Sequence, residues 1–157
     1  MSNFIRLAIA VALPLAVGGL SGFATAQGVQ DWYPTLVKPS FNPPSWVFGP
    51  VWTLLYLMMG IAAFLVWQKG WESGSVKSAL ALFAIQLILN GMWSVLFFGM
   101  RLPGPAFLEI LVLWVAIGAT LVLFWRVAPV AGMLLLPYQG WVTFAAVLNG
   151  AIWILNR

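Results

Sequence analysis

The chain has 157 residues, of which 63% are hydrophobic and only 6% are charged, and its mean hydropathy is +1.01. A soluble globular domain carries about 25% charged residues, so this chain has too few to cover a water-facing surface. The net charge of +4 comes from scattered basic residues that form no nucleic-acid-binding patch. The absence of cysteine and histidine from the sequence excludes disulfides, thiolate chemistry and the usual ligands of zinc and haem iron.

Five apolar runs are long enough to cross a bilayer, which requires about 20 apolar residues per helix. Breaking the chain at charges and at proline or glycine clusters gives the runs 5–26, 46–67, 78–100, 105–125 and 130–154. The runs are continuously apolar, whereas the strands of a membrane barrel alternate. Short connectors after the second, third and fourth runs favour antiparallel neighbours. The sequence therefore predicts an all-α membrane protein, a single domain over 1–157 that forms a five-transmembrane-helix bundle.

The first run, 5–26, has two interpretations. The small residues at 24–26 are typical of a signal-peptide cleavage site. However, the run is longer than a typical signal core, and Gly18 and Gly22 form a GxxxG spacing that lets helices approach closely. We expect the run to be retained as the first helix. We also expect a homodimer, with either these small residues or the third helix at its interface.

The longest connector, 27–45, contains four prolines and three aromatic residues. Proline stiffens a chain and removes backbone donors. A long loop with an aromatic side is expected to fold over something rather than to extend into water. The segment is therefore predicted to be a lid on the bundle, or alternatively an anchor that lies among the lipid headgroups.

Three of the runs carry amide, hydroxyl or aromatic side chains at a spacing that places them on one helix face. These residues are Trp52 and Tyr56 in the second run, Gln86, Asn90, Trp93 and Ser94 in the third, and Trp141, Ala145 and Asn149 in the fifth. Hydrogen bonding between helices explains each polar residue taken singly. The three faces together indicate a ligand cavity equally well, because ligand pockets are mostly apolar and aromatic with a few placed polar groups.

Three groups of residues occur in order from the long connector to the last helix. They are Asp31-Trp32-Tyr33, Lys38-Pro39, Asn42-Pro43-Pro44, Trp46 and Trp52; then Asn90, Trp93 and Phe97-Phe98-Gly99; then Pro137-Tyr138, Trp141, Phe144-Ala145 and Leu148-Asn149. With these groups, the chain resembles the TspO/translocator protein family, the tryptophan-rich sensory proteins related to the mitochondrial peripheral benzodiazepine receptor.

The resemblance implies a five-helix bundle, often a homodimer, that binds porphyrins and other lipophilic ligands under the 27–45 lid. By position, the family's ligand pocket falls here on Tyr33, Pro43, Trp52, Tyr56, Asn90, Trp93, Trp141 and Ala145. We expect Trp52 and Trp141 to face each other across one cavity. The cholesterol-recognition pattern of mitochondrial members requires a tyrosine where this chain has Gly150, so cholesterol is not expected as a ligand.

The leading hypothesis is an integral membrane receptor for porphyrins, acting in tetrapyrrole transport or regulation. It requires no cofactor, and protoporphyrin should bind at least as well as haem because no histidine can ligate iron. A first alternative is a light-dependent porphyrin-degrading enzyme in which Trp52 and Trp141 carry the redox chemistry. A second is a small ion-coupled transporter, supported only by Glu109, the sole acid inside an apolar run. In each case, we expect a multi-pass protein of the bacterial cell envelope whose environment is the lipid bilayer.

Overall fold

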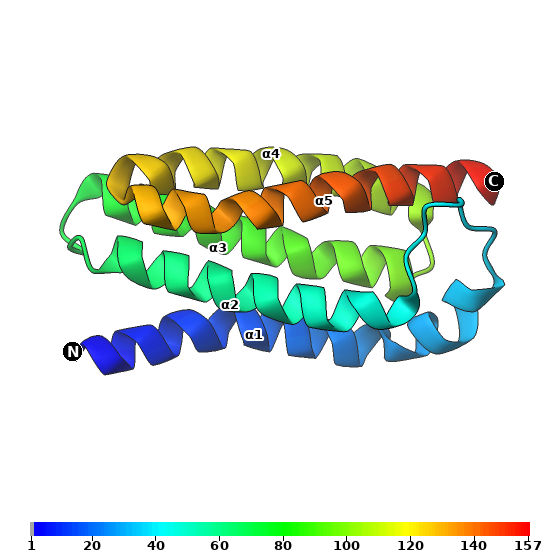
Figure 1. Cartoon of the computed structure of the whole chain (residues 1–157), viewed down its shortest axis with the longest axis horizontal. Coiled ribbons are helices and arrows are strands. Elements are labelled where there is room, and N and C mark those ends of the chain that lie inside the picture. The colour runs from blue at the N-terminus through cyan, green and yellow to red at the C-terminus, as the bar shows by residue number, and fades with distance from the viewer. Residues whose placement is uncertain (1) are drawn as a thin grey trace.

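The computed structural model describes residues 2–157 and contains five long helices that lie side by side along one axis (Figure 1). The helices are α1 (Asn3–Gln27), α2 (Phe48–Trp67), α3 (Gly74–Ser94), α4 (Pro103–Val127) and α5 (Pro129–Leu155). Five helical stretches are long and apolar enough to cross a membrane. The predicted all-α bundle of five transmembrane helices is therefore confirmed.

The helix boundaries differ from the apolar runs mainly where a charge or a proline interrupts the hydrophobic pattern. α3 begins at Gly74, whereas the predicted run begins at residue 78. Lys77 ends the apolar run, but a lysine in the first turn does not break a helix. α4 and α5 begin at Pro103 and Pro129. Proline suits the first helical turn because the N–H that it lacks has no partner inside the helix.

The 27–45 segment is partly helical rather than a loop throughout. α1 continues into a π-helical turn, Gly28–Trp32, and then into a 3-10 turn, Tyr33–Thr35. The regular structure ends just after Pro34, which donates no backbone hydrogen bond. The chain then crosses the end of the bundle near the C-terminus before it enters α2 (Figure 1). We keep the name lid for residues 27–45.

Gly28 allows the start of the lid to pack against the end of α3. A Cβ atom at this position would lie 1.9 Å from the carbonyl oxygen of Phe98, so no larger residue fits without a backbone shift. Phe98 belongs to a second π-helical turn, Val95–Gly99, which extends α3. This close approach places Tyr33 against Phe98, with 5.5 Å between the ring centroids.

Two glycines allow α1 and α2 to pack closely against each other. A Cβ atom at Gly18 would lie 2.3 Å from Cε2 of Tyr56, and one at Gly60 of α2 would lie 2.6 Å from Cα of Val11. Gly18 therefore serves the contact between α1 and α2. The homodimer remains a prediction, and it draws no support from this glycine.

We expect Gly18→Ala to lower the free energy of unfolding by about 1–3 kcal/mol, the usual cost of overpacking. Tyr56 cannot move aside easily, because it stacks on Trp52 and donates a hydrogen bond to Asn90. Thermal unfolding of the purified protein in detergent measures the effect.

Gly19→Ala is the matched control, because a Cβ atom at the neighbouring glycine would have nothing within 4 Å. Alanine is favoured over glycine inside a helix by about 0.5–1 kcal/mol, so this variant should be neutral or slightly more stable. Equal destabilisation by the two substitutions would contradict the close packing of Gly18 on Tyr56.

Candidate ligand-binding site

A cavity of about 270 Å³ lies at the end of the bundle that the lid covers. Its walls come from α1, α2, α3, α5 and the lid, whereas α4 contributes no lining residue. Eight aromatic residues line the cavity: Tyr33, Phe48, Trp52, Tyr56, Trp93, Phe97, Phe98 and Trp141. Between them lie a few hydroxyl groups, including those of Ser45 and Ser94. Such a cavity suits a largely apolar, aromatic ligand.

Six of the eight residues that the resemblance placed in a pocket line this cavity. They are Tyr33, Trp52, Tyr56, Trp93, Trp141 and Ala145. Pro43 and Asn90 do not line it. Pro43 lies half-buried within the lid, where its carbonyl accepts a hydrogen bond from the Asn42 side chain at 3.3 Å. Asn90 is buried just behind the wall, bonded to Tyr56.

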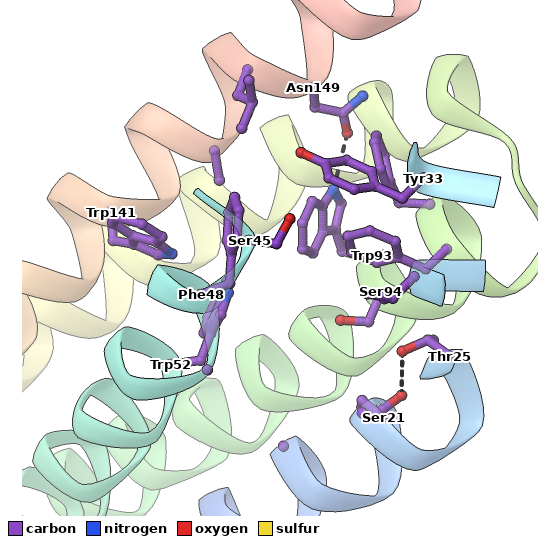
Figure 2. Close-up of a pocket in the computed structure, with 18 of the residues that line it drawn as sticks. Ser21, Thr25, Tyr33, Ser45, Phe48, Trp52, Trp93, Ser94, Trp141 and Asn149 are labelled. Carbon is purple, nitrogen blue, oxygen red and sulfur yellow. Dashed lines mark hydrogen bonds between the residues drawn. The ribbon is translucent and has the colours of Figure 1, made fainter. Parts of the chain in front are cut away.

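Trp52 and Trp141 both line the cavity, but Phe48 packs beside them. The rings of Phe48 and Trp141 meet edge to face, with 6.0 Å between their centroids. In the view of Figure 2, these three side chains are grouped at the left, while Trp93 and Tyr33 lie to the right. The two groups are not separated, because Trp52 and Trp93 lie side by side with 6.3 Å between their ring centroids, so the aromatic lining of the cavity is continuous.

A chain of buried hydrogen bonds supports one end of the cavity. The Tyr56 hydroxyl donates to Oδ1 of Asn90, and Nδ2 of Asn90 donates to the Tyr138 hydroxyl at 2.9 Å. The Tyr138 hydroxyl in turn donates to Oε1 of Gln86 at 2.8 Å. Trp52 stacks on Tyr56, with 5.7 Å between the ring centroids. The amides of α3 therefore join α2 to α5 and fix the tyrosine on which the cavity tryptophan rests.

A second amide fixes Trp93. Its indole Nε1 donates to Oδ1 of Asn149 at 3.0 Å, and Nδ2 of Asn149 donates to the carbonyl of Pro103 at 2.8 Å. Asn149 is 1% exposed and lines the cavity (Figure 2). The orientation of the Trp93 ring is thus determined by α5 and by the start of α4.

Two of the residues singled out from the sequence bury polar atoms that have no hydrogen-bond partner among the described residues. The indole Nε1 of Trp141, a residue of the cavity wall, is one such group, so a bound ligand could offer it an acceptor. The carboxylate of Glu109 is the other, but Glu109 does not line the cavity.

One wall of the cavity was not predicted from the sequence. α1 contributes small residues, namely Gly18, Ser21, Gly22 and Thr25. These residues are glycines and short hydroxyl side chains, so a search for aromatic and amide groups passes over them. Their spacing of three, one and three residues places them on one helix face. That pattern of small residues was the signal that could have identified the wall.

Residues 10–154 match the model of the TspO/MBR family. The chain belongs to this family. Over 155 residues it is 44% identical to the tryptophan-rich protein TspO of Archaeoglobus fulgidus, an alignment that covers 98% of this chain and 99% of that protein. It is 46% identical over 154 residues to the tryptophan-rich protein TspO of Chlorobaculum tepidum, with 98% of each chain covered.

The similarity extends to animals. The human translocator protein is 41% identical over 138 residues, which cover 87% of this chain and 81% of that protein. Family membership and the five apolar helices identify this TspO/MBR family member as a multi-pass membrane protein. Together they support a membrane-embedded binding or regulatory role.

Proposed function

We propose that this TspO/MBR family member is a membrane receptor for porphyrins and similar flat lipophilic ligands, acting in tetrapyrrole transport or regulation. The observation that carries the proposal is the cavity under the lid, with its eight aromatic residues and few polar groups. A porphyrin is a flat apolar disc with two carboxylates at one edge. Stacking of aromatic rings on such a disc adds about 0.5–1.5 kcal/mol per pair beyond the burial of area.

The polar edge of a porphyrin would lie toward the lid. Lys38 lies there, with its Nζ atom 4.9 Å from the centroid of the Tyr33 ring. The same ammonium group donates to the carbonyl of Leu36 at 3.1 Å. A carboxylate at the edge of the cavity would thus find a cation or water, while the apolar disc stays among the aromatic rings.

Titration of the purified protein with protoporphyrin, followed by quenching of tryptophan fluorescence, tests the proposal. We expect saturable quenching, and binding of haem that is no tighter, because no histidine is present to ligate iron. Trp71→Phe is the control for quenching away from the site, since Trp71 packs on Trp67 and does not line the cavity. Quenching that never saturates would overturn the proposal.

Light-dependent breakdown of the bound porphyrin is a second candidate, favoured by the presence of Trp52 and Trp141 in the cavity wall. If it occurs, we expect Trp52→Phe and Trp141→Phe to slow breakdown more than they weaken binding, because phenylalanine is harder to oxidise than tryptophan. Absorbance under illumination, with and without oxygen, measures the rate, and the fluorescence titration measures binding. Equal losses of breakdown and binding would exclude a redox role for these side chains.

A further inference from the structure

The lid is bonded to the far end of the chain through one side chain. The backbone N–H of Val37 donates to Oδ1 of Asn156 at 2.9 Å, and Nδ2 of Asn156 donates to the carbonyl of Val37 at 2.8 Å. The same Nδ2 also donates to the carbonyl of Ile152 at 2.8 Å, which holds the amide against the last turn of α5. Asn156 therefore pairs with both polar groups of one lid residue.

The remaining lid interactions are of a different kind. Tyr33 packs on Phe98, and Phe41 packs on Phe144 of α5, with 6.4 Å between the latter pair of ring centroids. The hydrogen bond from the Tyr33 hydroxyl to Asn42 lies within the lid. Among the side-chain hydrogen bonds of residues 2–157, only those of Asn156 join the lid to the end of another helix.

We propose that Asn156 is a positioning residue that latches the lid, and that release of this latch lets a ligand reach the cavity from water. The inference rests on the proposed function, because it treats the cavity as the site that the lid covers. Lifting the lid would enlarge the cavity, because Val29, Tyr33 and Ser45 of the lid line it and its volume of about 270 Å³ lies below the roughly 300–1,000 Å³ of pockets that hold drug-sized ligands.

The location of the latch makes it reversible. The bonds between Asn156 and the backbone of Val37 are exposed, so water can replace them when the lid lifts. Asn156 does not line the cavity, so the latch forms equally well with the cavity empty or filled. Two exposed hydrogen bonds of modest net strength correspond to a shift of about tenfold in the opening equilibrium.

A latch of this kind changes the two binding rates together and leaves the affinity almost unchanged. Asn156→Ala should raise both the association rate and the dissociation rate of protoporphyrin by about tenfold, with less than about a twofold change in Kd. Stopped-flow tryptophan quenching measures both rates. Asn156→Asp, which keeps the acceptor for the Val37 N–H but loses the donor, should give a smaller change. Glu72→Gln, in the connector between α2 and α3, is the control and should leave both rates unchanged.

A second readout needs no ligand. The chain has no cysteine, so Ser94→Cys introduces a single thiol into the cavity wall. A charged, water-soluble methanethiosulfonate reagent should label this thiol slowly, and about tenfold faster once Asn156→Ala is added, because labelling requires the lid to open.

The two readouts separate the two hypotheses. Faster labelling without any porphyrin binding would support the latch and overturn the proposed function. Normal binding with unchanged rates and unchanged labelling would overturn the latch and indicate access through the lipid. A weaker Kd with an unchanged association rate would also overturn it, because Asn156 would then support the bound state rather than gate the cavity.

Discussion

Replacing Ala145 by leucine is expected to weaken protoporphyrin binding at least about tenfold while the fold stays intact. Ala145 lines the cavity one turn from Trp141 and one turn from Asn149. Leucine would add three carbon atoms to a space of about 270 Å³. An aromatic ligand displaced by these atoms would stack on fewer rings, and each ring pair contributes about 0.5–1.5 kcal/mol. The fluorescence titration measures the weaker binding, and the thermal unfolding midpoint should change little because the new atoms enter empty space.

Two controls make this result specific to the cavity. Val147→Leu changes a residue two positions along α5 that is 58% exposed on the outer surface, so it should not affect binding. Trp71→Phe removes a tryptophan outside the cavity and should also be without effect. If Trp71→Phe weakens binding as much as Ala145→Leu does, the ligand site lies elsewhere on the protein.

The second large effect is expected at the buried amide of α3. Asn90→Leu should lower the free energy of unfolding by about 2–4 kcal/mol, because a buried polar group without a partner costs about 1–3 kcal/mol. The Tyr56 hydroxyl would lose its acceptor, and the Tyr138 hydroxyl would lose a donor while keeping its bond to Gln86. Asn90 is 1% exposed, so water could not take its place.

A double substitution checks the cause. Replacing both partners of a hydrogen bond by apolar groups is nearly neutral, so Tyr56→Phe should recover about 1 kcal/mol in the Asn90→Leu background. Coupling energies of this kind average about 0.6 kcal/mol in membrane proteins, and we expect a larger value here because both residues are buried. A coupling energy of zero would show that the hydrogen bond between Tyr56 and Asn90 contributes nothing to stability.

The sequence was sufficient for the features that depend on hydrophobicity and helical spacing. The apolar runs identified five helices, and the shared faces of α2, α3 and α5 identified Trp52, Trp93 and Trp141, which line one cavity. The same helical spacing could not distinguish residues that line the cavity from residues that are buried behind its wall. Asn90 was therefore expected in the pocket, although its amide is used up in bonds to Tyr56 and Tyr138.

Other features depend on contacts between distant parts of the chain, which helical spacing does not report. The helical start of the lid depends on the approach of Gly28 to Phe98. The bond between Val37 and Asn156 joins residues 119 positions apart. Composition and local sequence patterns do not reveal either pair, because one partner in each pair is a backbone group.

An odd number of membrane crossings has a topological consequence. Asn3 and Leu155 lie at opposite ends of the bundle, so the two ends of the chain face different compartments (Figure 1). The lid and the C-terminal end of α5 lie together at one end, joined through Asn156. A ligand that arrives through water under the lid therefore comes from the compartment that holds the C-terminus. A reporter fused after Arg157 that is active on only one side of the membrane would identify the compartment that the lid faces.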